Sequence, residues 1–216
     1  MYIIEIMGVN KRLFGLQENY TLDDLREAYL KKLKSFIERA REKHWEGFVS
    51  HGRIFQKLND AFLVLYKQAM EPTKRTEAHD RAEEIFREGK KFLYEGKNRK
   101  AAELFQNATV LNQHKHYYYG FLGIALKNLK SYDAAVKALE TAIELFPISQ
   151  EYWLTLAETY LEAGQKSKAM ECFAAAFLVD PTNTKPLEKM DAIDPTAFIL
   201  KKRKKGTGIF GLFKKK

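Results

Sequence analysis

The sequence predicts an all-α protein in which helix pairs stack into a right-handed α-solenoid. The main observation is a repeat, because alanine recurs at equal intervals of 34 residues at Ala101, Ala135 and Ala169. Composition agrees, since 12 glycines and 5 prolines in 216 residues fall mostly between periodic segments. In the first third of the chain, apolar residues recur at three- and four-residue steps, the period of an amphipathic helix.

The repeat predicts three helix pairs, at residues 82–115, 116–149 and 150–183, in a region of 80–193 that ends in a short capping helix. Besides the alanines above, two further series keep the same offset: Phe105, Leu139 and Phe173, then Ala108, Ala142 and Ala176. Gly89, Gly123 and Ala157 mark a tight crossing of the two helices in each unit. A lone helix pair has no neighbour for its second face, so we expect the units to stack.

These positions resemble the tetratricopeptide repeat family. The third unit fits the family signature most fully, with Trp153, Leu156, Ala157, Tyr160, Gly164, Ala169, Phe173, Ala176 and Pro181. The first unit departs from it, because Glu88 replaces an apolar residue and Gln113 replaces the proline. The resemblance implies that the first helix of each unit lines an inner surface that holds a peptide or a partner helix.

The resemblance also implies which residues bind the partner. The predicted partner-binding residues are Phe86, Lys90, Tyr94, Tyr117, Phe121, Ile124, Asn128, Glu151, Leu154 and Glu158, with Glu83, Gly120, Thr155 and Glu162 on the same surface. We expect an apolar slot around Gly120 flanked by third-unit carboxylates, and hence an apolar or basic peptide or helix as the partner. Tyr117 could instead pack between repeats, as we expect Tyr119 to do.

Some family members grip a terminal carboxylate with a clamp of lysine, asparagine and arginine. The corresponding positions hold Phe86, Lys90, Phe121, Glu151 and Thr155 in this sequence. Only one cation remains and an anion has been added. The acidic C-termini of heat-shock chaperones are therefore not expected partners.

The N-terminal third predicts a hairpin of two helices. Thr21 and Asp24 form a capping box at the start of the first helix, and a second helix ends before Pro72. We expect a polar loop around Trp45 to Gly52 between them. Residues 10–72 are thus a predicted separate module.

This hairpin resembles a J-domain, the module of DnaJ-type co-chaperones. The resemblance rests on Leu13-Phe14-Gly15-Leu16, on residues 21–29 and on residues 55–65. J-domains act on 70-kDa heat-shock chaperones through a His-Pro-Asp turn, which should fall at residues 37–39. Those positions hold Ile37, Glu38 and Arg39, so we expect the helix to continue through them and the module to be degenerate, serving as a docking or structural unit.

The positive charge of the chain is concentrated at its C-terminal end. Lys201 to Lys216 carry eight Lys and Arg and no acid, so residues 1–200 carry 37 minus 8, or 29, cations against 28 anions. The predicted tail, 194–216, interleaves basic and aromatic residues that could contact an anionic membrane or an anionic partner: Lys201, Lys202, Arg203, Lys204, Lys205, Phe210 and Phe213. A disordered, solubilising end is an equal alternative, and nucleic-acid binding is a weaker one.

No catalytic constellation emerges from the sequence. His114 and His116 do not have helical metal-ligand spacing, and we interpret both as surface residues. Cys172 is expected to be a buried, inert thiol. We therefore expect no enzyme activity, no cofactor and no metal. No stretch approaches the ~20 apolar residues of a membrane span, so we expect a cytoplasmic protein, with peripheral membrane contact as an option.

Together these features predict a non-enzymatic adaptor that binds another protein through the inner surface of the repeats. One alternative is a co-chaperone that recruits a 70-kDa heat-shock chaperone. A weaker alternative is nucleic-acid binding by the tail. Residues 1–8 fit neither predicted module well.

Overall fold

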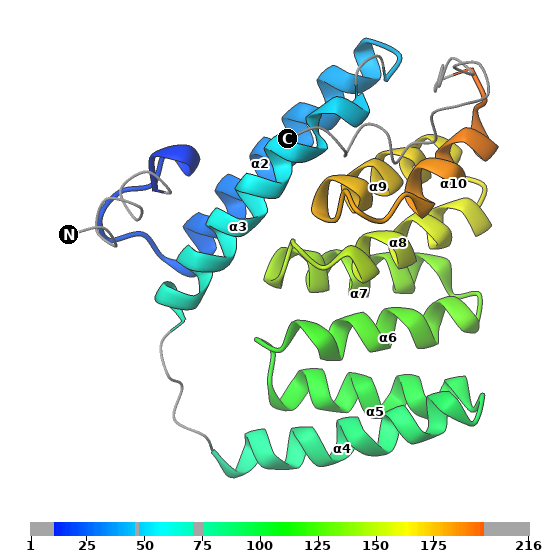
Figure 1. Ribbon diagram of the computed structural model, residues 1–216. Helices are drawn as coiled ribbons and strands as arrows, with labels where there is room; N and C mark the ends of the chain where they lie inside the picture. Colours follow the sequence, from blue (N-terminus) through cyan, green and yellow to red (C-terminus); the bar gives the residue numbers. More distant parts are fainter. Residues whose placement is uncertain (1–10, 46–47, 71–75, 197–216) are drawn as a thin grey trace.

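The computed structural model describes residues 11–45, 48–70 and 76–196 (Figure 1). Over these ranges the principal elements are helices. They are α2 (Leu22–Glu42), the 3-10 helix η1 (Phe48–His51), α3 (Gly52–Ala69), α4 (Glu77–Tyr94), α5 (Asn98–Leu111), α6 (His116–Asn128), α7 (Tyr132–Leu145), α8 (Gln150–Glu162), α9 (Lys166–Val179) and α10 (Lys185–Ile193). The all-α prediction is confirmed.

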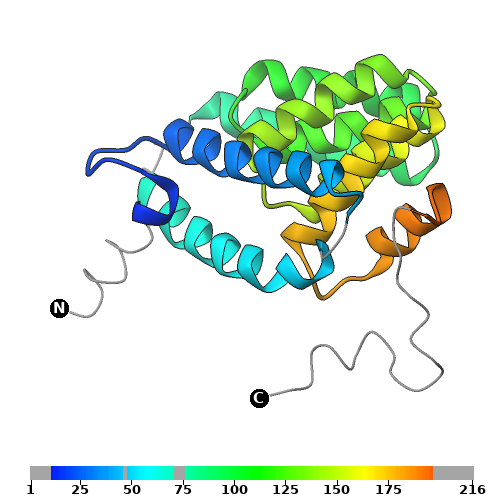
Figure 2. The same cartoon turned by 90° about the horizontal axis from the view of Figure 1, so that it is seen from above.

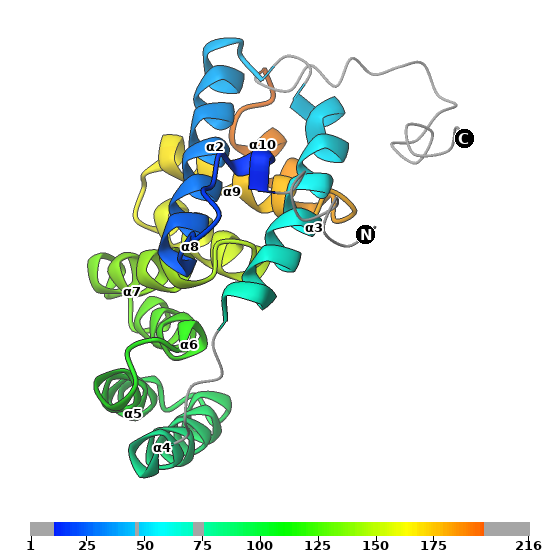
Figure 3. The same cartoon turned by 90° about the vertical axis from the view of Figure 1, so that its left-hand side faces the viewer.

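Helices α4 to α9 form three antiparallel pairs that stack in register. Figure 3 shows the first four of them nearly end on, in two columns. Helices α6 and α8 begin at His116 and Gln150, the predicted first residues of the second and third units, whereas α4 begins earlier, at Glu77. We call α4, α6 and α8 the inner helices and α5, α7 and α9 the outer helices.

Small residues lie where the helices of each pair cross, as the repeat predicted. Ala101, Ala135 and Ala169 are each 0% exposed. A Cβ atom added to Gly89 would lie 2.7 Å from Cε1 of Phe105, and one added to Gly123 would lie 2.5 Å from Cγ of Leu139. Any larger residue would separate the two helices, so the small residues set the spacing of the pairs.

The N-terminal hairpin starts as predicted. The Thr21 hydroxyl accepts the amide of Asp24 at 3.2 Å, and the Asp24 carboxylate accepts the amide of Thr21 at 2.8 Å, which completes the capping box. Helix α2 then runs without a break through residues 37–39 to Glu42. The expectation that the helix continues through the site of a J-domain turn is confirmed.

The connection after α2 was predicted to be a polar loop, and this prediction is wrong for its two aromatic residues. Trp45 and Phe48 are both buried, and their rings meet edge to face at 5.4 Å. Phe48 also contacts the ring of Phe177 in α9 at 5.7 Å. The connection is therefore part of the core, because these aromatic groups are withdrawn from water against the third repeat.

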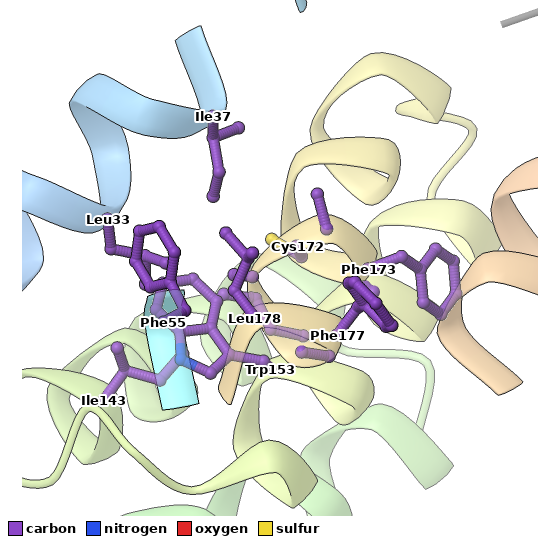
Figure 4. Close-up of a cluster of buried hydrophobic side chains, with 14 of the residues drawn as sticks. Leu33, Ile37, Phe55, Ile143, Trp153, Cys172, Phe173, Phe177 and Leu178 are labelled. Carbon is purple, nitrogen blue, oxygen red and sulfur yellow. The ribbon is translucent and has the colours of Figure 1, made fainter. Parts of the chain in front are cut away.

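The hairpin packs on the outer surface of the third repeat. Its contacts within the described ranges are mainly with α7 and α9, and Figure 2 shows it beside the gold helix α9. Figure 4 shows residues of α2 and α3, such as Ile37 and Phe55, facing Cys172 and Leu178 of α9. One apolar cluster includes residues from both regions, so the predicted module 10–72 shares its core with the repeats.

Asn59 of α3 connects the hairpin to the end of α9. Its amide donates to the carbonyls of Leu178 and Val179 at 2.9 and 2.8 Å, and its carbonyl accepts the Tyr29 hydroxyl at 2.6 Å. The last carbonyls of a helix have no partner within the helix. A buried side chain from a distant segment supplies one here, which fixes the register between α3 and α9.

The last repeat is closed by two elements. Helix α10 packs on α9, as the predicted capping helix should, and Met190 within it is 0% exposed. The hairpin covers a further face of the same helix. The first repeat has its own apolar cluster, formed by α4, α5 and parts of α6 and α7.

Candidate partner-binding surface

The inner helices carry the predicted partner-binding residues, and these differ in exposure. Tyr94, Asn128 and Glu151 are exposed, and Tyr94 is 77% exposed. Lys90, Tyr117, Phe121, Ile124, Leu154 and Glu158 are half-buried. Phe86 is 7% exposed and Thr155 is buried, so these two side chains support the surface from beneath and are hardly accessible to a partner.

An aromatic cluster joins the first two repeats at this surface. The Phe86 ring lies 5.2 Å from the rings of both Tyr117 and Phe121 and 5.5 Å from Phe105, centroid to centroid. The Lys90 ammonium lies 5.4 Å from the centre of the Phe121 ring, a cation–π distance. Lys90 therefore partly covers the aromatic groups, and its charge is available at their edge.

Three consecutive tyrosines start α6 and have different surroundings. The Tyr117 hydroxyl donates to the carboxylate of Glu83, and burial together with this carboxylate raises the pKa of Tyr117 to about 12. Tyr118 is fully buried, and Tyr119 packs half-buried against the main core, as predicted. Tyr117 thus contributes both to packing between repeats and to the inner surface.

Carboxylates gather on the third repeat, and one lysine neutralises part of their charge. The Lys127 ammonium lies 2.8 Å from Glu158 and 3.8 Å from Glu162, which bridges α6 and α8. Glu151 is exposed on the same helix. The charge of the inner surface therefore changes along the array, from Lys90 on α4 to the carboxylates of α8.

The space beside Gly120 is not the predicted slot. A Cβ atom added to Gly120 would lie 2.5 Å from Cε1 of Tyr152, so this ring fills the position. The Tyr152 hydroxyl lies 2.7 Å from Nδ1 of His116, and the imidazole stacks on Phe146 at 4.6 Å. The close approach at Gly120 serves packing between the second and third repeats.

His116 also corrects the interpretation of the two histidines. His114 is exposed as expected, but His116 is half-buried between aromatic rings. Burial lowers the pKa of His116 to about 4, and the charges of Lys115 and Arg26 contribute. A neutral imidazole is therefore the form that the fold accommodates near neutral pH.

Two hollows involve the hairpin, which the sequence analysis did not predict. One, of about 980 Å³, lies between α2 and α3 and includes Phe36 and Leu58. The other, of about 480 Å³, lies between α2 and the helices α7, α8 and α9. The sequence signal for the docked hairpin was the apolar outer face of α9, where Ala174, Ala175, Phe177 and Leu178 occur together.

Other predicted features have these outcomes. Cys172 is buried as expected, and burial raises the pKa of its thiol. Across the described ranges no group of three or more His, Cys, Asp or Glu side chains could hold a metal ion, and no helix there is long and apolar enough to cross a membrane. The predicted tail residues Lys201 to Phe213 and the first eight residues lie outside the described ranges.

The geometry defines a stacked array of antiparallel helix pairs with an inner surface distinct from the face that holds the hairpin. The tetratricopeptide repeat model matches residues 129–189, so this segment is similar in sequence to that family. Comparison with curated protein sequences gave no match.

Solved structures extend the likeness to the whole array. The Arabidopsis OM64 TPR domain has a TM-score of 0.53 and 17% identity, over 55% of this chain and 98% of that one. PcrH in complex with the chaperone-binding region of PopD has a TM-score of 0.53 and 18% identity, and the match covers 57% of this chain and 98% of PcrH. The first TPR of Spaghetti (RPAP3), bound to the HSP90 peptide SRMEEVD, has a TM-score of 0.52 and 14% identity, and the match covers 54% of this chain and 93% of that domain. The repeats therefore have the tetratricopeptide repeat fold.

Proposed function

We propose that this chain is a non-enzymatic adaptor that binds a segment of another protein on its inner surface, the face formed by α4, α6 and α8. The observation that carries the proposal is the position of the hairpin. It packs on the outer helices α7 and α9, so the inner helices keep partly exposed aromatic and charged residues. Structures with this fold include complexes of PcrH with a PopD region and of RPAP3 with an HSP90 peptide.

The preferred partner is an apolar segment with basic residues. Phe121, Ile124 and Leu154 offer apolar surface, and Glu151 and Glu162 offer exposed negative charge beside it. An acidic chaperone C-terminus suits this surface poorly, because the clamp positions include Glu151 and two phenylalanines. Complementary charge gives specificity and faster association more than raw affinity.

The hairpin has a structural role in this proposal. Its first helix, α2, continues through residues 37–39, the position expected for a J-domain turn, which leaves no His-Pro-Asp element to stimulate a chaperone ATPase. Its apolar face is buried against α9. The basic tail, for its part, is proposed to contact an anionic surface, either lipid or protein.

The test is a binding assay with defined peptides on the full chain. Fluorescence anisotropy would compare an amphipathic peptide with lysine flanks, the same peptide with glutamate flanks, and SRMEEVD. We expect the lysine-flanked peptide to bind at least about tenfold more tightly than the others, a difference of about 1.4 kcal/mol.

Charge reversal locates the binding surface. Glu151→Lys with Glu162→Lys should remove the preference for lysine flanks. The matched control, Glu84→Lys with Glu103→Lys, changes the net charge equally at exposed positions of the first repeat and should keep it. Equal effects of the two pairs, or tightest binding of SRMEEVD, would contradict the proposal.

A further inference from the structure

The cleft between the hairpin and the outer helices has an apolar floor and a charged rim. It has a volume of about 480 Å³, and Ile37, Ile143 and Cys172 are on its floor. Figure 4 shows these three side chains, from α2, α7 and α9, in the same apolar cluster as Leu33 and Trp153. The rim carries four carboxylates and two lysines: Glu38, Glu140, Glu144, Glu171, Lys34 and Lys168. Clefts of this size with apolar floors and a few charged groups are typical of binding sites.

The rim has more negative charge than its own cations balance. Glu140 accepts the Tyr160 hydroxyl at 3.1 Å, and Glu171 pairs with Arg41 of α2. Glu38 and Glu144 are exposed and have no ion-pair partner in the part of the chain that the structure describes. A ligand with an apolar part and several cations would complement this cleft.

The sequence contains such a segment beyond the described residues. Ile209-Phe210-Gly211-Leu212-Phe213 lies between the basic run Lys201 to Lys205 and three final lysines. Helix α10 runs back along α9 and ends at Ile193, near the end of α9 that carries Lys168 and Glu171 (Figure 1). At ~3.3 Å per extended residue, residues 197–216 can span on the order of 60 Å, so the cleft is within reach.

We propose that residues 201–216 of the chain itself bind in this cleft, with Phe210 and Phe213 on the apolar floor and lysines against Glu38 and Glu144. The contact would join α2 to α7 and α9. An intramolecular ligand needs little intrinsic affinity, because a tether of this kind gives an effective concentration on the order of 1 mM. While the segment is bound, its cations are not available to an anionic membrane.

Thiol labelling of the full chain tests the apolar part of the contact. Cys172, the only native cysteine, is buried and reacts slowly, so Lys34→Cys supplies an exposed thiol on the cleft rim, where a maleimide reports access to the cleft. Phe210→Ser with Phe213→Ser should raise the labelling rate at least about threefold while the far-UV circular dichroism melt is unchanged, because tethered binding is weak and local. Phe92→Ser, on the distant first repeat, is the control and should leave the labelling rate unchanged.

Vesicle binding tests the contact between the tail lysines and the cleft carboxylates. It also distinguishes binding of the tail in the cleft from binding of the tail to lipid. The probe is vesicles of phosphatidylserine and phosphatidylcholine. Glu38→Lys with Glu144→Lys should release the tail and strengthen vesicle binding more than the control Glu84→Lys with Glu103→Lys, which adds the same charge elsewhere. Equal vesicle binding by the two pairs, or a labelling rate that the Phe210 and Phe213 changes do not alter, would overturn the proposal.

Discussion

Helices α5 and α9 occupy the same place in their repeats but have different surroundings. Both present an alanine at 0% exposure to their partner helix, at Ala101 and Ala169. On the opposite face, α5 has Gln106, Asn107 and Val110, whereas α9 has Ala174, Ala175 and Leu178 at the equivalent positions. The residues that recur every 34 positions determine how the two helices of a pair pack on each other. The residues on the outer face determine whether another element packs on that pair.

The largest expected effect comes from truncating equivalent side chains in the two helices. Leu178 is 0% exposed and Val110 is 67% exposed. Leu178→Ala should lower the free energy of unfolding by about 2–5 kcal/mol through lost burial and a cavity. Val110→Ala should change it by less than about 0.5 kcal/mol. Urea denaturation of both variants measures the difference, and similar losses would show that α9 is no more enclosed than α5.

A smaller effect is expected at the polar connection to α9. Asn59→Ala removes two donors from the α9 carbonyls and the acceptor of the Tyr29 hydroxyl. Unpaired buried polar groups should lower stability by about 2–3 kcal/mol. Tyr29→Phe removes only one of these bonds and should cost less, about 1 kcal/mol. Urea denaturation measures both losses, and a Tyr29→Phe variant as stable as the native chain would show that the bond between Tyr29 and Asn59 does not contribute.

A pH effect is expected where the second and third repeats meet. The pKa of His116 falls from 6.5 to about 4 on folding, so the unfolded chain binds a proton more readily between these values. Stability contributed by the neutral imidazole is therefore present above pH 6.5 and is lost as the pH falls toward 4. Allowing for the partial exposure of the ring, the loss should be about 1–2 kcal/mol. Unfolding measured at pH 7 and pH 4.5 should show it in the native chain but not in His116→Gln.

The smallest effect on stability is expected on the inner surface. Lys127→Gln removes the ion pair with Glu158 and the longer contact with Glu162. Stability should change by less than about 1 kcal/mol, because both partners are partly exposed. Affinity for a lysine-flanked peptide should rise, since two carboxylates lose their intramolecular partner. Unchanged affinity would indicate that the ligand does not contact α8.

The repeats could be predicted from the sequence because each helix pair needs the same residue types at the same crossing, so those residues recur at a fixed interval. Gly89 and Gly123 are small since a neighbouring side chain fills the space of a Cβ atom, and this need returns in each unit. The capping box at Thr21 is equally local. Such features involve residues close in sequence or at a fixed offset.

The docked hairpin and the surroundings of His116 could not be predicted in this way. Asn59 contacts Leu178 across more than a hundred positions, and no local rule relates the two residues. His116 looks like a surface histidine until Tyr152 and Phe146 are placed around it. For α9, the apolar outer face was present in the sequence, but it indicates only that something covers the helix. The binding roles of the inner residues remain predictions.

The hairpin and the third repeat should unfold as one unit, while the first repeat is stabilised mainly by its own pair. Native-state hydrogen exchange on the full chain, followed across increasing denaturant, tests it most directly. We predict that amides of α3 and α9 exchange through the same opening, at a higher free energy than amides of α4 and α5. Exchange of α3 well before α9, with α9 retaining full protection, would show instead that the hairpin and the third repeat open separately.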